Sequence, residues 1–263
     1  MHSTAILSGL QQLGYERYDL AAQLGVSALD EGFHTLALEF DNLPVDPYAE
    51  SSGRFRRFGR GVLLPWSGEF DWMPETAADA SSDAVNRYQQ GTHNPEYADQ
   101  VRQLPSLTEA IKNSSLLAEL IRFDFARTSW HDEDRCWPIH VGVHLIKLSV
   151  AGPGARAAAT PDMLHQDGEP YTFAHLIYRC NASGGENVIA AAQCAGKSPD
   201  DVPEDSVLAR FTLSRPLDSY GVKDDMVSHY VAPVTAGPGP GPSERAILLI
   251  DFTPMTQRPH AGP

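Results

Sequence analysis

The sequence predicts an α+β protein that is mainly β, with a double-stranded β-helix (jelly roll) core and flanking N-terminal helices. Two observations lead to this prediction. Apolar residues recur at helical spacing in much of the first half of the chain, and after Pro138 they alternate with other residues as they do in strands. Turn-forming residues separate the successive strand-like runs, which favours antiparallel sheets packed on one another.

Residues 1–135 are expected to form the helical part. Apolar residues fall on one helix face within residues 3–40, and again from Pro105 to about Ile121. Between these helices, residues 71–100 are rich in Ala, Asp, Ser, Asn and Gln and contain little that must be buried. We expect this stretch to be a long surface excursion and a candidate lid over a site.

Residues 136–255 are expected to form the jelly-roll core. The segment from Ile139 to Val150 alternates like a strand, and Asn181–Gly185 carries a strong turn signal. Together the two parts are expected to form one domain, residues 1–263. The predicted strands cover residues 139–150, 171–180, 188–192, 207–213, 226–234 and 246–252.

Composition narrows the range of functions. The chain has 263 residues, 42% of them hydrophobic, which is enough for one large domain with a real core. Its formal net charge of −14 argues against nucleic acid or an anionic membrane surface as a partner. No apolar run approaches the roughly 18 residues of a membrane span. The three cysteines have no paired spacing, so we expect reduced thiols and a cytoplasmic location; a homo-oligomer stays open.

The stretch from Asp162 to Val188 contains the central motif, His165-Gln166-Asp167. In an extended segment, residues two apart point to the same side. An imidazole nitrogen and a carboxylate oxygen can therefore meet at one point. They are two of the three ligands of the 2-His-1-carboxylate facial triad, which leaves three positions on Fe(II) open.

Two later residues complete a candidate site. His229 lies in a predicted strand, and in a jelly roll a late strand running back past the motif can supply the third ligand. Arg245 opens the otherwise apolar strand RAILLIDF. A buried arginine requires an anionic partner, and a carboxylate that accepts two hydrogen bonds suits its planar guanidinium.

Other polar clusters have competing interpretations. Arg54, Arg56 and Arg57 lie in a strand-like run and either face solvent or bind a substrate carboxylate. His131 and Glu133 form a rival metal-binding pair, which lies among like charges without a strand pattern. The remaining strand histidines are expected to be packed or hydrogen-bonded rather than ligands. They are His140, His144 and His175.

Taken together, these segments resemble the Fe(II)/2-oxoglutarate-dependent dioxygenases, within them the group typified by L-isoleucine dioxygenase, which hydroxylates free amino acids. The resemblance covers about residues 40–255 and rests on the combination of motifs rather than on any one of them. The motifs are VGVHLIKLSV, PDMLHQDG, HLIYRCNASGGEN, DDMVSHYVAPV and RAILLIDF.

The resemblance implies a cofactor set and a reaction. Fe(II) would be held by His165, Asp167 and His229, and Arg245 would pair with the distal carboxylate of 2-oxoglutarate. With O2, the expected reaction is hydroxylation of an unactivated C–H bond of a free L-amino acid or cyclic imino acid, with release of succinate and CO2. The candidates for binding the substrate carboxylate are Arg54, Arg56, Arg57 and Arg179, the last with a structural role as the alternative.

Two alternatives stay open at this point. The same cofactors could act on a carrier-tethered or other small metabolite, or desaturate the substrate instead of hydroxylating it. An alternative of another class is a cupin-like metal-binding module without turnover. Arg245 argues against such a module, because that arginine has no role there without a dicarboxylate co-substrate.

Overall fold

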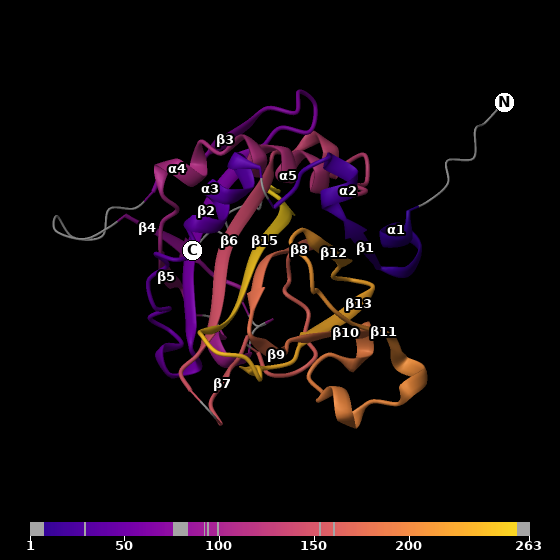
Figure 1. Cartoon of the computed structure of the whole chain (residues 1–263). Helices are drawn as coiled ribbons and strands as arrows, with labels where there is room; N and C mark the ends of the chain where they lie inside the picture. Colours follow the sequence, from indigo (N-terminus) through magenta and orange to yellow (C-terminus); the bar gives the residue numbers. More distant parts are fainter. Residues whose placement is uncertain are drawn as a thin grey trace.

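The computed structural model describes residues 8–28, 30–75, 84–91, 93, 95–98, 100–152, 154–159 and 161–256, and it is mainly β (Figure 1). Its largest unit is a seven-stranded antiparallel sheet with the strand order β1-β12-β8-β15-β6-β2-β3. The strands are β1 (Tyr15–Asp19), β2 (Arg54–Leu63), β3 (Phe70–Trp72), β6 (Ile139–Val150), β8 (Tyr171–Cys180), β12 (Asp218–Lys223) and β15 (Ser243–Pro254).

Three smaller sheets complete the β structure. The sheet β11-β10-β13 consists of β10 (Glu186–Ala191), β11 (Val207–Thr212) and β13 (Val227–Val231). The sheet β7-β14-β9 consists of β7 (Arg156–Ala157), β9 (Ala182–Gly184) and β14 (Val234–Ala236), and a separate hairpin pairs β4 (Val85–Tyr88) with β5 (Arg102–Pro105). A shared core joins the large sheet to the sheet of β11-β10-β13 through buried residues that include Leu176, Ile189 and Ile247.

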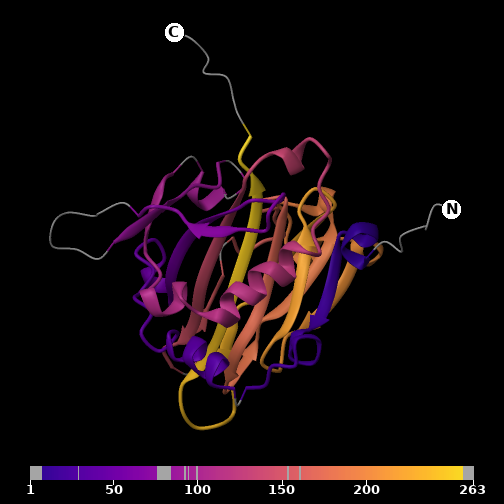
Figure 2. The same cartoon turned by 90° about the horizontal axis from the view of Figure 1, so that it is seen from above.

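Helices cover the other face of the large sheet, and α5 crosses it in Figure 2. Thr108 caps α4 and Ser114 caps α5, so the helix predicted after Pro105 is divided in two at Asn113. The α-helices are α1 (Gly9–Leu13), α2 (Leu20–Leu24), α3 (Glu31–Leu38), α4 (Glu109–Lys112) and α5 (Ser115–Phe125). The short 3-10 helices are η1 (Glu50–Ser52), η2 (Pro95–Tyr97), η3 (Asp134–Cys136), η4 (Ala192–Cys194), η5 (Pro199–Asp201) and η6 (Glu204–Ser206).

The alternation along β15 determines which side chains reach the interior between the sheets. Leu248, Ile250 and Phe252 pack in the core beneath the helices. The intervening positions, among them Leu249 and Asp251, point to the opposite face because successive strand residues alternate. The large sheet therefore has an apolar outer face and an inner face that carries polar groups.

The prediction of a helical part over residues 1–135 needs correction. The described residues of this part include the five α-helices but also β1 to β5, of which β1, β2 and β3 belong to the large sheet. Tertiary pairing explains the difference, since β1 pairs with β12 and β2 with β6, partners far away in sequence. Ser3, whose side chain would suit the N-cap of a first helix, lies outside the described residues; Ser8 caps α1.

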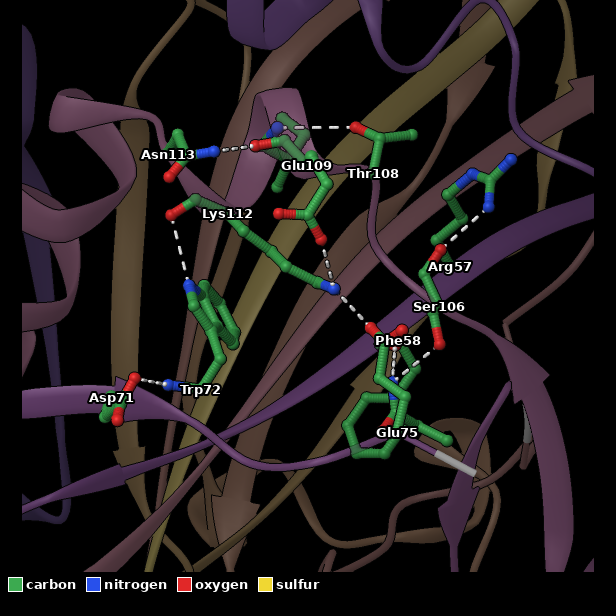
Figure 3. A network of polar contacts seen from close by, with 12 residues as sticks. Arg57, Phe58, Asp71, Trp72, Glu75, Ser106, Thr108, Glu109, Lys112 and Asn113 are labelled. Carbon is green, nitrogen blue, oxygen red and sulfur yellow. Dashed lines mark hydrogen bonds and ion pairs between the residues drawn. The ribbon is translucent and has the colours of Figure 1, made fainter. Parts of the chain in front are cut away.

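The edge of the large sheet is tied to α4 by a polar network (Figure 3). Lys112 forms ion pairs with Glu75 and Glu109, and its carbonyl oxygen accepts a hydrogen bond from Trp72 Nε1 at 3.1 Å. This network holds Trp72, at the end of β3, and Glu75, three residues later, against α4. No helix among the described residues is long and apolar enough to cross a membrane.

Candidate metal and substrate site

The His-x-Asp motif and β13 are brought together by backbone pairing. The N–H of His165 donates to the carbonyl of His229 at 3.0 Å, and the N–H of His229 donates to the carbonyl of His165 at 2.9 Å. This isolated antiparallel bridge places the two imidazoles side by side, with ring centroids 4.4 Å apart. A late strand therefore runs past the motif, as the sequence predicts.

Three side chains converge at this point. One ligand atom from each of His165, Asp167 and His229 lies within 4.8 Å of the others, and among the described residues this is the only three-residue group able to hold a metal ion. Asp167 Oδ1 is 3.5 Å from His165 Nε2, and Oδ2 is 3.2 Å from His229 Nε2. The rival pair, His131 and Glu133, belongs to no such group among these residues.

Neighbouring groups hold the cluster in place. His165 Nδ1 lies 2.9 Å from the carbonyl of Met163, which leaves Nε2 free to face the other two residues. The carboxylate of Asp224 accepts hydrogen bonds from the backbone N–H groups of Asp167 and Gly168, both at 2.8 Å. This clamp fixes the turn that follows the motif.

The donor set fits a divalent transition metal. Nε2 of His229 is buried and lies 3.2 Å from Asp167 Oδ2 without good hydrogen-bond geometry, which is costly unless the atom also binds something else. Burial alone would raise the pKa of the Asp167 carboxyl, but the adjacent rings of His229 and His165 hold it well below its usual range. A site that favours an ionised carboxylate beside two imidazoles offers the ligands of the 2-His-1-carboxylate type.

Arg245 is a buried cation with no ion-pair partner in the described part of the chain. Its side chain is only 5% exposed and its Nε has no hydrogen-bond partner. Burial lowers its pKa to about 10. Tyr220, which interacts electrostatically with Arg245, also lines the cavity that holds the cluster. An anion bound beside Arg245 would relieve this unfavourable burial.

The predicted arginines lie in three different places. Arg54 and Arg56 line the cavity that contains the three-residue cluster. Arg57 points away from it and donates to the carbonyl of Ser106 at 2.7 Å (Figure 3). Arg179 pairs in register with Arg245 and donates to the carbonyls of Ala182 and Gly184 at 2.6 and 2.7 Å, so its contacts are those of a turn-stabilising residue.

His144 links two charged residues at the wall of the cavity. Its Nδ1 lies 2.5 Å from Nη2 of Arg56, and its Nε2 lies 3.0 Å from Oδ2 of Asp251. A guanidinium only donates, so Nδ1 accepts and the proton of the neutral ring sits on Nε2, which donates to Asp251. Burial and then the charge of Arg56 hold the pKa of His144 well below its usual range, in agreement with a neutral ring.

Two buried carboxyl groups face the same cavity. Burial raises the pKa of Asp251 to about 7, with a further contribution from the charge of Asp167. Burial also raises the pKa of Glu169 well above its usual range, reinforced by the charges of Asp251 and Asp167. Both residues also line a second, neighbouring cavity, which His93 lines as well, so the two carboxyl groups lie where the cavities adjoin.

Several residues of this wall were not singled out from the sequence. A signal existed for Asp251, which lies six residues after Arg245 in an apolar strand, an even spacing that places both on one face. Arg102 and Tyr88 offered no comparable signal. The β4–β5 hairpin brings both to the cavity, Tyr88 from the stretch expected to lie at the surface and Arg102 from just beyond it. From that stretch, Tyr88 and Gln90 line the cavity that holds the cluster, and His93 lines a neighbouring cavity.

Comparison with known proteins adds independent information. A family model described as "2OG-Fe dioxygenase" matches residues 37–251. The chain is 28% identical over 229 residues to 3(1)-hydroxy-L-isoleucine 4-dioxygenase of Pantoea ananatis, covering 85% of this chain and 81% of that protein. It is also 28% identical over 220 residues to L-isoleucine-4-hydroxylase of Bacillus thuringiensis, covering 82% of this chain and 80% of that protein.

Solved structures share the fold. The crystal structure of IDO from Bacillus thuringiensis has a TM-score of 0.67 at 20% identity, covering 94% of this chain and 96% of that one. A bsmA homologue from Methylobium petroleophilum PM1 has a TM-score of 0.71 at 18% identity, covering 95% of this chain and 92% of that one. At these identities, the likeness concerns the fold.

Proposed function

The chain belongs to the 2OG-Fe dioxygenase family, and from this premise we propose that it hydroxylates an unactivated C–H bond of a free L-amino acid or cyclic imino acid, releasing succinate and CO2. The family uses Fe(II), 2-oxoglutarate and O2, so the chain is a dioxygenase. The amino acid part of the proposal is supported by the two relatives named for hydroxylation of isoleucine or its derivative.

The observation that carries the proposal is the convergence of His165, Asp167 and His229. In this proposal they are the iron ligands: two imidazole Nε2 atoms and one carboxylate. Bound Fe(II) supplies the chemistry of O2 reduction coupled to 2-oxoglutarate decarboxylation and C–H oxidation. The buried Nε2 of His229, which faces Asp167 without good hydrogen-bond geometry, supports this role, since coordination would satisfy it.

The protein's own residues prepare this centre. The hydrogen bond of His165 Nδ1 to Met163 selects the tautomer whose Nε2 can coordinate. Thr172 Oγ1 and Gln90 Nε2 each lie 3.4 Å from the carboxylate oxygens of Asp167 and restrain its rotation. Ligands oriented in advance lose little freedom when the metal binds.

Arg245 is the proposed partner of the distal carboxylate of 2-oxoglutarate. It is buried and has no ion pair within the described residues, so a carboxylate supplied by the co-substrate would neutralise it. Leu249 and Val231 line the cavity that holds the cluster, as does Tyr220. Apolar side chains at these positions limit the access of water to the cavity.

The proposal also concerns the architecture. We take the facing sheets as a double-stranded β-helix within one dioxygenase domain spanning residues 1–263. The core that includes Leu176, Ile189 and Ile247 supports it, because these residues belong to strands of both sheets. The short distance from the β13 backbone to the motif follows from such an arrangement.

The test is 2-oxoglutarate-dependent succinate formation under Fe(II) and ascorbate, with a panel of proteinogenic and cyclic amino acids. We expect one panel member to stimulate succinate release and to gain one oxygen atom in mass. Loss of two hydrogens instead would identify desaturation. Slow succinate formation that no amino acid stimulates would contradict the free-amino-acid assignment, and iron-loaded protein without any turnover would point to a binding module.

A further inference from the structure

One side of the cavity holds more positive charge than the protein itself neutralises. Arg54, Arg56 and Arg102 are 3%, 6% and 1% exposed, and all three line the cavity. Arg54 Nε binds Asp46 Oδ2 at 2.8 Å. Within the described ranges, neither Arg56 nor Arg102 forms an ion pair with a carboxylate. Burying such charges is strongly unfavourable unless an anion joins them.

The contacts of Arg56 and Arg102 hold their position without neutralising them. Arg102 donates from Nη2 to Gln90 Oε1 at 2.7 Å, and its guanidinium lies 4.8 Å from the ring centroid of Tyr88. Arg56 lies 5.1 Å from the centroid of the same ring. The Nε atoms of both arginines are buried and have no hydrogen-bond partner. Two oriented guanidinium groups thus retain donors for a planar anion.

Acidic groups occupy the other side of the same cavity. Glu169 Oε1 accepts a hydrogen bond from Tyr88 Oη at 3.2 Å, while its Oε2 is buried and has no partner. Asp251, 2% exposed, accepts from the neutral ring of His144. No lysine or arginine in the part of the chain that the structure describes forms an ion pair with either acid.

Tyr88 contacts both the basic and the acidic side of the cavity, so the arginines and Glu169 lie close together. The guanidinium groups of Arg56 and Arg102 lie 5.1 and 4.8 Å from the centroid of the Tyr88 ring, and the hydroxyl of this tyrosine donates a hydrogen bond to Glu169. The unsatisfied positive and negative groups are therefore separated by about one aromatic side chain. A free α-amino acid carries a carboxylate and an ammonium on one carbon atom, which matches this pairing of charges.

We propose that this wall is the α-amino acid subsite, in which Arg56 and Arg102 bind the carboxylate of the substrate and Glu169 and Asp251 bind its ammonium. The inference rests on the proposed function and makes it more specific. A substrate must carry both charged groups, because without the carboxylate two buried guanidinium groups stay unpaired, and without the ammonium the two buried carboxyl groups lose their proposed partner. An N-acylated or carrier-tethered amino acid lacks one of them and is rejected.

The experiment measures kcat/KM for each substrate analogue with the wild-type enzyme and with each variant. The probes are the amino acid that stimulates succinate release, its 2-hydroxy acid analogue (no ammonium) and its carboxamide (no carboxylate). Both analogues keep nearly the size of the parent compound. With the wild-type enzyme we expect each analogue to lose about 100-fold in kcat/KM, as is typical when one partner of a buried charge pair is removed.

The variants should distinguish the residues that bind the substrate carboxylate from those that bind its ammonium. In Glu169→Gln, the penalty for the 2-hydroxy acid should fall below about tenfold while that for the carboxamide persists. In Arg102→Met, the pattern should reverse. Glu204→Gln and Arg210→Met, both at exposed positions, are the matched controls and should behave as wild type. A general loss of structure would lower activity with every probe and would not produce a crossed pattern.

Other results would overturn the subsite. Equal penalties in both variants, with normal stimulation by the parent amino acid, would refute this assignment and leave the proposed function intact. Succinate formation that no free amino acid stimulates would overturn the subsite together with the amino acid assignment, yet keep the iron chemistry. A binding readout is independent of turnover: under nitrogen, with Fe(II) and 2-oxoglutarate bound, the amino acid should raise the Tm and both analogues should not.

Discussion

Arg56 on β2 and Asp251 on β15 are joined through the two ring nitrogens of His144, which lies on the strand between them. The neutral imidazole accepts from the guanidinium and donates to the carboxylate. Neither charge can shift without moving the ring, so the positions of the two groups are coupled. In the proposed subsite, this coupling fixes the separation of a carboxylate site from an ammonium site.

Replacing His229 by alanine should abolish iron binding and succinate formation. The variant leaves only His165 and Asp167 to coordinate, so we expect Fe(II) affinity to fall by at least about 100-fold, beyond the effect typical of losing an outer-sphere partner. Metal content after anaerobic gel filtration measures the loss. His34→Ala, at an exposed helix position, is the control. Full iron occupancy in His229→Ala would contradict the assigned ligand set.

Replacing Arg245 by methionine should change thermal stability differently in the presence and in the absence of 2-oxoglutarate. Without it, removal of a buried unpaired cation should raise the Tm or leave it unchanged. With it, the KM for 2-oxoglutarate should rise about 100-fold and the stabilisation by 2-oxoglutarate should disappear. Arg210→Met is the exposed control. An unchanged KM would exclude Arg245 from co-substrate binding.

Introducing a methyl group at Gly142 should displace the carboxylate of Asp251. An ideal Cβ there would lie 2.1 Å from Asp251 Oδ2, closer than atoms can approach. We expect Gly142→Ala to raise the KM for the amino acid about tenfold or more, with Fe(II) and 2-oxoglutarate binding preserved. Gly152→Ala, where no atom lies within 4 Å, is the matched control. A normal KM in Gly142→Ala would argue against a substrate contact by Asp251.

The apo-protein should lose stability as pH rises through the titration of Asp251. Burial raises its folded-state pKa to about 7, whereas the unfolded value is about 3.9. The native state thus binds the proton more tightly, and this contribution is complete below about pH 4 and lost as pH rises through about 7. The slope approaches about 1.4 kcal/mol per pH unit. Urea unfolding measured over about pH 5 to 8 should show that the free energy of unfolding declines less steeply with pH in Asp251→Asn than in the wild type.

The buried pair of Asp124 and His175 should stabilise the packing of α5 on the large sheet. Asp124 Oδ2 lies 2.9 Å from His175 Nε2, and both side chains are fully buried. Asp124→Ala leaves the histidine without its partner and should lower the free energy of unfolding by about 3 kcal/mol. Denaturant titration measures it, with Asp225→Ala at the surface as control. A change below about 0.5 kcal/mol would show that the pair contributes little.

The convergence of His165, Asp167 and His229 can be predicted from the sequence because each signal is local or periodic. His165 and Asp167 share a face through strand alternation, and His229 lies in a strand with a clear pattern. Arg102 could not be found in this way. Its position depends on the β4–β5 hairpin folding back over the large sheet, and its segment carries no strong strand pattern.

The same distinction applies to the fold. The long strands β6 and β8 match their predicted bounds, since each is long and apolar, whereas β15 extends beyond the predicted 246–252 at both ends. The strand β12 was missed, because Asp218–Lys223 is short and interrupted by Gly221. Its place between β1 and β8 is determined by pairing with distant segments, information that no local window contains.

The backbone of β15 fixes the distance between two residues of the proposed active site. Arg245 and Asp251 project from one face six residues apart, which corresponds to about 20 Å of strand. Since β6 and β8 pair with it on both sides, loop changes cannot alter this length. Inserting one residue between them would turn Asp251 toward the helices. In the proposed site, redesign of substrate preference should therefore substitute side chains near Arg245 or Asp251 and keep the number of β15 residues between them.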